Sequence, residues 1–127
     1  MTMKMIMLSI NAKRENKMNY FYIPRSMPNE QEYQTTFHLD FDIADHFGLE
    51  GVIDTFNRAF GFWKHNIKYI TELCFVMNIR SWFWYEKGNK QLAKLYSDFY
   101  YKVRDFVYDD NSPFNEKEQS YFFQMID

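Results

Sequence analysis

The stretch at residues 67–86, IKYITELCFVMNIRSWFWYE, constrains the fold of this chain more than any other. On a helical wheel its apolar side chains cover both sides of the helix, which is typical of a core helix, a helix under a partner or a membrane span. Charges near the centre of a membrane helix cost about 2.5 to 3.5 kcal/mol each, and Lys68, Glu72 and Arg80 interrupt this run. The stretch therefore predicts a helix in a core or at an interface, and no membrane span.

A clearly amphipathic segment precedes this stretch. Residues 49–64 place Val52 and Phe56 on an apolar face and Asp54 among the polar side chains of the opposite face. This pattern predicts a surface helix that packs on the central one. The apolar pattern is broken near His65, so we expect a bend between the two helices rather than one continuous rod.

Two further helices are predicted after residue 86. The sequence KGN at residues 87–89 combines a glycine suited to a helix end with an asparagine suited to the next N-cap. Residues 90–108 then show a second amphipathic pattern. Asn115 and Glu118 have the spacing of a capping box, which predicts a last short helix. Its predicted docking residues are Tyr121, Phe122 and Met125.

The segments before residue 49 are less regular. Residues 24–33 contain two prolines and no periodicity, which predicts a loop. Asp40 or Asp42 could cap a short helix that ends at Gly48. Residues 1–25 are interpreted as an N-terminal extension that forms either a short β-hairpin or a tail.

These patterns together predict an all-α fold, a small bundle of four to five helices around one central buried helix. A chain of 127 residues fits one domain, so we expect residues 26–127 to form a single helical domain. Cys74 is the only cysteine, which excludes an intramolecular disulfide and favours a buried, unreactive thiol. The chain shows no secretory signal pattern, and a cytoplasmic location is expected.

One cluster has the residue types of a metal site, namely His38, Asp40, Asp42, Asp45 and His46. On a helix Asp42 and His46 would share a face, and imidazole and carboxylate are both zinc ligands. The spacing matches no established ligand motif, and acidic residues are expected near a helix start because of the helix dipole. We therefore expect no metal, no cofactor and no enzymatic activity. A metal-dependent hydrolase with His38, Asp42 and His46 as ligands is a minor alternative.

Charge and aromatic content favour a binding function. Residues 26–54 contain no lysine or arginine, whereas residues 55–104 are mainly basic. Such blocks either pack against each other or form a patch that attracts a charged partner. Aromatic residues make up 21% of the chain, more than its own core requires, and they dominate interfaces as well as cores. The candidate partner-binding residues are Tyr101, Tyr108, Phe62, Asp40, Asp45, Lys90 and Lys94.

Several short sequences carry a resemblance to a known family. In chain order they are TTF, DIADHFG, DTFNRAF, KYITEL, YEKGN, LAKLY and SYFF. Their order and spacing resemble a family of short uncharacterised proteins associated with mobile elements of gut bacteria. The resemblance implies no catalytic residue or cofactor. It implies a setting in which small proteins act against host defences, as anti-CRISPR proteins do, or serve transfer and copy control.

The leading functional hypothesis is a non-enzymatic interaction protein that inhibits a larger host protein or ribonucleoprotein effector that targets nucleic acid. Acidic residues would compete for the basic groove that phosphates occupy. The alternative is a protein that binds single-stranded RNA or DNA through exposed aromatic rings and lysines. Those lysines are Lys64, Lys68, Lys87, Lys90 and Lys94. Self-association through leftover aromatic surface is a further expectation that the sequence leaves open.

Overall fold

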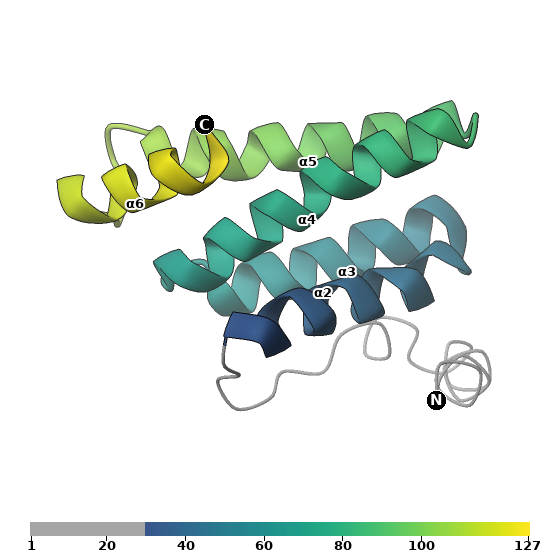
Figure 1. Ribbon diagram of the computed structural model, residues 1–127, viewed down its shortest axis with the longest axis horizontal. Helices are drawn as coiled ribbons and strands as arrows, with labels where there is room; N and C mark the ends of the chain where they lie inside the picture. The colour runs from purple at the N-terminus through teal and green to yellow at the C-terminus, as the bar shows by residue number, and fades with distance from the viewer. Residues whose placement is uncertain (1–29) are drawn as a thin grey trace. The chain divides into compact units, whose positions relative to one another are not determined.

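The computed structural model describes residues 30–127, with side chains from residue 37 onward. This range is helical and contains no strand, which confirms the all-α prediction. It divides into two compact units, one ending at Phe62 and the other formed by Trp63–Asp127. The predicted hairpin or tail at residues 1–25 lies outside the described residues. The helices in Figure 1 are α2 (Glu30–Asp45), α3 (Gly48–Trp63), α4 (Ile67–Glu86), α5 (Lys90–Tyr108) and α6 (Glu116–Ile126).

The first unit contains α2, which is longer than predicted. The sequence predicted a loop up to residue 33 and a helix capped by Asp40 or Asp42, but α2 already begins at Glu30 and both aspartates lie within it. Both predictions are wrong, and the second has a clear reason. Phe37, Phe41 and Ala44 recur at helical spacing and are all buried, so one apolar stripe continues through the aspartates.

The turn between α2 and α3 follows the predicted glycine signal. The backbone N–H groups of His46 and Phe47 donate to the carbonyl oxygens of Ile43 and Ala44, which closes the end of α2. Gly48 then adopts a φ of 72°, a left-handed conformation that glycine tolerates best. Val52 and Phe56 are buried on α3 as predicted.

One polar residue of α3 lies where the sequence did not place it. Asp54 was predicted on the solvent face, but only 2% of its surface is exposed. Its Oδ1 accepts a hydrogen bond from Nε of Arg58 at 3.1 Å, whereas Ile53 is exposed. The buried face of α3 is therefore rotated relative to the simple wheel and includes a carboxylate.

The second unit is built around α4. Asn66 caps this helix, because its side chain accepts a hydrogen bond from the backbone N–H of Tyr69 at 3.1 Å. Helix α4 packs against both α5 and α6. Its buried residues are Tyr69, Ile70, Thr71, Leu73, Cys74, Val76, Met77 and Arg80. The predicted core role of this helix is thus confirmed for its first four turns.

Two buried polar groups of α4 have clear partners on α5. Nε of Arg80 donates to the hydroxyl oxygen of Tyr96 at 3.3 Å, and the guanidinium lies over the tyrosine ring. The thiol of Cys74 donates weakly to the carbonyl of Tyr100. Burial raises the pKa of this thiol, which keeps it protonated and unreactive as predicted. None of the described helices combines the length and apolar composition needed to cross a bilayer.

The turn from α4 to α5 confirms the interpretation of KGN. Gly88 has a φ of 85°, and the side chain of Asn89 accepts a hydrogen bond from the N–H of Leu92 at 3.1 Å. The buried face of α5 includes Tyr96, Phe99 and Val103. The two helices therefore form a hairpin whose turn is fixed by local backbone chemistry.

Helix α6 is held on α5 by one buried ring and by polar contacts. Phe122 is fully buried, and the ring of Tyr108 meets it edge to face with 5.5 Å between centroids. The side-chain amide of Gln119 donates to the carbonyl of Val107 at 2.9 Å. Met125 was also predicted to dock, but it is exposed. Only part of the predicted docking set therefore contacts the helix pair.

The capping box at the start of α6 is confirmed, and it permits a stability prediction. The Asn115 side chain accepts from the Glu118 N–H at 2.9 Å, and the Glu118 carboxylate accepts from the Asn115 N–H at 3.0 Å. Asn115→Ala should lower the free energy of unfolding by about 1 kcal/mol. Asn111→Ala, in the exposed turn before α6, is the control and should change it by less than about 0.5 kcal/mol in urea unfolding. Equal effects of the two substitutions would contradict the capping role.

Candidate functional site

The last turns of α4 expose large aromatic side chains. Trp82 is 61% exposed and Tyr85 is 62% exposed, and Phe83 between them is also exposed. No residue of α4 beyond Arg80 is buried. Contiguous exposed aromatic surface of this kind marks interaction sites in soluble proteins. Most apolar side chains of α4 are thus part of the core up to Arg80, and those beyond it lie at the surface.

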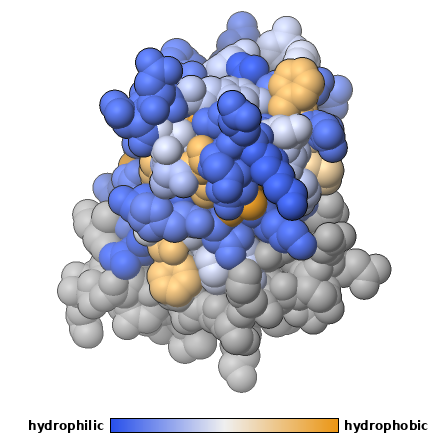
Figure 2. Space-filling model, turned by 90° about the vertical axis from the view of Figure 1, so that its left-hand side faces the viewer, coloured by the Kyte–Doolittle hydropathy of each residue, from blue (hydrophilic) through white to orange (hydrophobic). Residues whose placement is uncertain are grey.

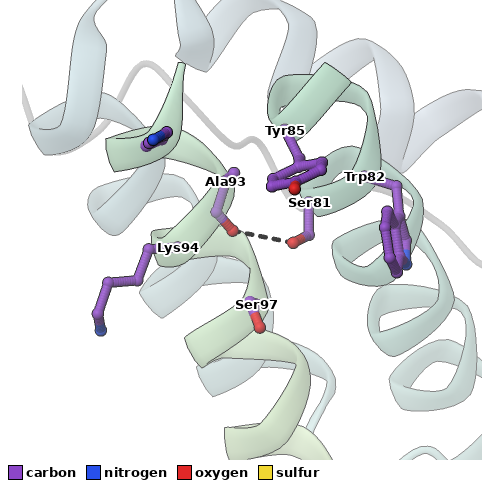
Figure 3. A pocket seen from close by; sticks show the side chains of 7 residues that line it. Ser81, Trp82, Tyr85, Ala93, Lys94 and Ser97 are labelled. Carbon is purple, nitrogen blue, oxygen red and sulfur yellow. Dashed lines mark hydrogen bonds between the residues drawn. The ribbon is translucent and has the colours of Figure 1, made fainter. Parts of the chain in front are cut away.

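A groove lies between the end of α4 and the start of α5, with a volume of about 620 Å³. Figure 3 shows Trp82 and Tyr85 on the α4 side of this groove and Ala93, Lys94 and Ser97 on the α5 side. We call it the α4–α5 groove and define it by its lining residues. These are Ser81, Trp82, Tyr85, Lys90, Ala93, Lys94 and Ser97.

Small residues form the floor of the α4–α5 groove. The Ser81 hydroxyl donates to the carbonyl of Ala93 at 2.9 Å, which ties the two helices together (Figure 3). The rings of Trp82 and Tyr85 meet edge to face, with 5.9 Å between centroids and 82° between planes. The two rings therefore form an aromatic corner on the α4 side of the groove.

The α5 side of the groove is cationic. Lys90 and Lys94 lie one helical turn apart, and the first turn of α5 contains no acidic residue. Nζ of Lys94 pairs with Oδ2 of Asp98 at 2.8 Å, and both side chains are largely exposed. Exposed pairs of this type contribute only about 0.3 to 0.5 kcal/mol, so a partner carboxylate can displace Asp98 at little cost.

The three aromatic residues that the sequence proposed for partner binding have different surroundings. Tyr101 is exposed on α5 outside the groove, and Phe62 is exposed in the first unit. Tyr108 is used within the chain, because its hydroxyl donates to Oδ2 of Asp127 at 2.8 Å and its ring packs on Phe122. Burial and this hydrogen bond raise the pKa of Tyr108 to about 12. Tyr108 thus has a structural role in holding α6.

The proposed acidic residues differ in exposure. Asp40 is only 2% exposed, because it lies on the apolar stripe of α2. Asp40 therefore has almost no exposed surface, and its role in partner binding stays a prediction. Asp45 is half-buried at the end of α2. Of the seven predicted partner-binding residues, the α4–α5 groove brings together Lys90 and Lys94.

The candidate metal ligands do not form a ligand set in the described part of the chain. Asp42 and His46 are exposed and His38 is half-buried. Nδ1 of His46 lies 2.8 Å from the backbone carbonyl oxygen of Asp42, not from its carboxylate. Among residues 37–127 no three His, Cys, Asp or Glu side chains are placed to hold a metal ion.

The opposite end of the helix hairpin has a different surface. Figure 2 shows the left-hand side of Figure 1, away from the α4–α5 turn. Hydrophilic side chains cover most of the described surface there, and hydrophobic side chains are scattered among them. Scattered apolar side chains are normal on a protein surface. The aromatic corner beside Lys90 and Lys94 is therefore a stronger candidate site than this face.

No protein-family model, no curated protein and no solved structure matches this chain. The α4–α5 groove offers aromatic faces, ammonium groups and hydroxyl groups, and its lining contains no His, Cys, Asp or Glu. This composition suits recognition of an apolar group beside negative charge.

Proposed function

We propose that this chain is a non-enzymatic interaction protein that acts as a stoichiometric inhibitor of a larger effector protein. The observation that carries the proposal is the exposed aromatic corner of Trp82 and Tyr85 beside two lysines. Tryptophan and tyrosine are enriched among the residues that dominate binding energy at interfaces. Burying the exposed part of each ring contributes about 2 to 4 kcal/mol before the costs of association, from its area and about 25 cal/mol per Å².

The proposal also specifies the class of partner. The resemblance to proteins of mobile elements supports a target among host defence effectors that act on nucleic acid, as for an anti-CRISPR protein. Exposed carboxylates support it as well, since Asp42 and Glu50 are exposed in the first unit. Carboxylates can occupy a basic surface in place of phosphates. In this proposal the inhibitor and its target meet in the cytoplasm.

Binding of single-stranded nucleic acid is the second candidate function. The observation that favours it is the presence of Lys90, Lys94 and two aromatic rings in one groove, which are the components of a stacking platform. The geometry supports it less well. The rings of Trp82 and Tyr85 are almost perpendicular, so successive bases cannot stack on both.

The test is capture of a partner by the tagged full-length chain from lysate of its own host, with and without nuclease treatment. We expect one large protein to remain in near-equal amount after nuclease treatment. Loss of the complex with nuclease would support nucleic-acid binding instead and would contradict the inhibitor proposal. Recovery of no stoichiometric partner in either half would contradict it as well.

A point substitution then locates the contact surface. Trp82→Ala should weaken the captured complex by about tenfold or more, which corresponds to about 1.4 kcal/mol. The control is Phe123→Ala, which removes an exposed ring from α6, away from the groove, and should change affinity by less than about twofold. Affinity is measured by calorimetry with the purified partner. Equal effects of the two variants would remove the α4–α5 groove from the proposal.

A further inference from the structure

We propose that the α4–α5 groove binds an acidic linear segment of the partner protein that carries one bulky apolar side chain, preferably an aromatic ring. This inference rests on the proposed function and specifies the chemistry that the groove recognises. It is carried by two independent features of the groove, the shape of its aromatic corner and the sign of its charge.

The shape of the corner suits one ring. Because the planes of Trp82 and Tyr85 lie at 82°, an incoming ring that stacks on one of them presents its face or edge correctly to the other. Offset stacking and edge-to-face contacts are the preferred aromatic geometries. The volume of about 620 Å³ lies within the range of sites that hold a small ligand. The groove can therefore hold one large side chain and the backbone next to it.

The charge of the groove selects the residues that flank this side chain. Two lysines line it and no carboxylate does. The positive end of the α5 dipole adds to their field, since the first turn of α5 has no acidic residue to offset it. Carboxylates of an incoming segment can pair with Lys90 and, by replacing Asp98, with Lys94. Charge complementarity thus favours aspartate or glutamate beside the apolar anchor.

The same features disfavour a nucleic-acid strand. If each of the two lysines neutralises one phosphate of a single strand, the slope of log Kobs against log salt concentration is only about −1.4, at about −0.7 for each phosphate, which is a weak drive for a polyanion. Asp98 and the exposed Glu86 lie close to the lysines in sequence and would repel a continuous phosphate backbone. A peptide can instead place one or two carboxylates at the lysines and avoid these acidic residues.

The experiment is selection of a displayed random peptide library on the immobilised full chain, with the Trp82→Ala variant used to remove peptides that bind elsewhere. We expect enrichment of peptides in which an aromatic residue is flanked by Asp or Glu. Their affinities are then measured by fluorescence polarisation against wild type and variants. A single-stranded oligothymidylate of similar length is measured in parallel.

The decisive variant reverses the charge of the α5 side. Lys90→Glu combined with Lys94→Glu should weaken the acidic peptides by about tenfold or more and shift a repeated selection toward basic flanking residues. A glutamate at position 90 interacts favourably with the helix dipole, so helix α5 should remain folded, which circular dichroism checks. Lys117→Glu, an exposed charge reversal on α6, is the control and should leave affinity within about twofold.

Each other outcome overturns the inference. These outcomes are the absence of enrichment, enrichment of neutral or basic peptides, no effect of the double reversal, and tighter Trp82-dependent binding of oligothymidylate. Failure of the proposed function is a separate result. A nuclease-resistant complex that needs Trp82 but not the two lysines would contradict the preference for acidic segments and still support the proposed inhibitor function. Peptide binding without any cellular complex would contradict the inhibitor function and still support peptide recognition by the groove.

Discussion

Replacing Phe122 with alanine is expected to lower the free energy of unfolding by about 3 to 5 kcal/mol. Phe122 is the one residue of α6 that is fully buried, and the ring of Tyr108 packs against its face or edge at 5.5 Å. The substitution removes most of a buried ring and leaves a cavity that the helices can close only in part. Urea unfolding followed by circular dichroism measures the loss.

The neighbouring residue provides a matched control. Phe123 is 57% exposed on the same helix, so Phe123→Ala makes the same chemical change without a cavity. Alanine has the same helix propensity advantage at both positions. We expect Phe123→Ala to change stability by less than about 0.5 kcal/mol. Similar losses for the two variants would show that α6 does not dock through Phe122.

The helix ends at the α4–α5 turn and at the start of α6 were predicted accurately from the sequence. Gly88 and Asn89 end one helix and begin the next, and Asn115 and Glu118 form the predicted capping box. These signals could be read because a cap depends on the residue itself and on backbone groups within three or four positions. No distant part of the chain is needed to form them.

Burial of single polar residues was not predicted. Asp40 and Asp54 were both assigned to polar surface, and both are buried. A helical wheel gives the direction of a side chain but not which other residues cover it. The helix propensity of aspartate gives no help, because it does not distinguish a buried position from an exposed one. Similarly, α2 continues through Asp40 and Asp42, which have good capping chemistry, because its apolar stripe continues past them.

The candidate site was predicted in part. Lys90 and Lys94 were named because they are charged residues on the polar face of a predicted helix, and they line the groove. Trp82 and Tyr85 were seen only as part of an apolar stretch. Their exposure depends on which face of the last turns of α4 the packing against α5 leaves uncovered. That relation between two helices is tertiary and is not contained in either helical pattern.

Stability is also expected to depend on the protonation of Asp54. Burial raises the pKa of Asp54 from 3.8 to about 6, Arg58 lowers it in part and Glu50 raises it. Oδ2 of this carboxylate is buried without a hydrogen-bond partner among the described residues. The folded state therefore holds a proton that the unfolded state has lost between about pH 4 and pH 6. By linkage the stability of wild type falls as pH rises through this window and is then constant.

Asp54→Asn should remove this pH dependence. A shift of one pKa unit corresponds to about 1.4 kcal/mol, and water reaches the partly exposed Arg58 beside the carboxylate. Between pH 4 and pH 7 the free energy of unfolding of the variant should therefore rise by about 2 kcal/mol relative to that of wild type. The undiscounted pKa shift would correspond to about 3 kcal/mol. The asparagine amide can also change the stability by a constant amount. That change is the same at every pH, so it does not affect the pH-dependent gain.

Urea unfolding at several pH values measures the difference between variant and wild type, which cancels the titration of the other carboxylates. The matched control is Asp98→Asn, which changes another aspartate in a pair four residues apart, but one that is largely exposed. It should alter stability by less than about 0.5 kcal/mol at any pH. A flat difference for Asp54→Asn would mean that water reaches the Asp54 carboxylate freely. The buried position of this side chain would then be wrong, because a solvated carboxylate has no reason to retain its proton above pH 4.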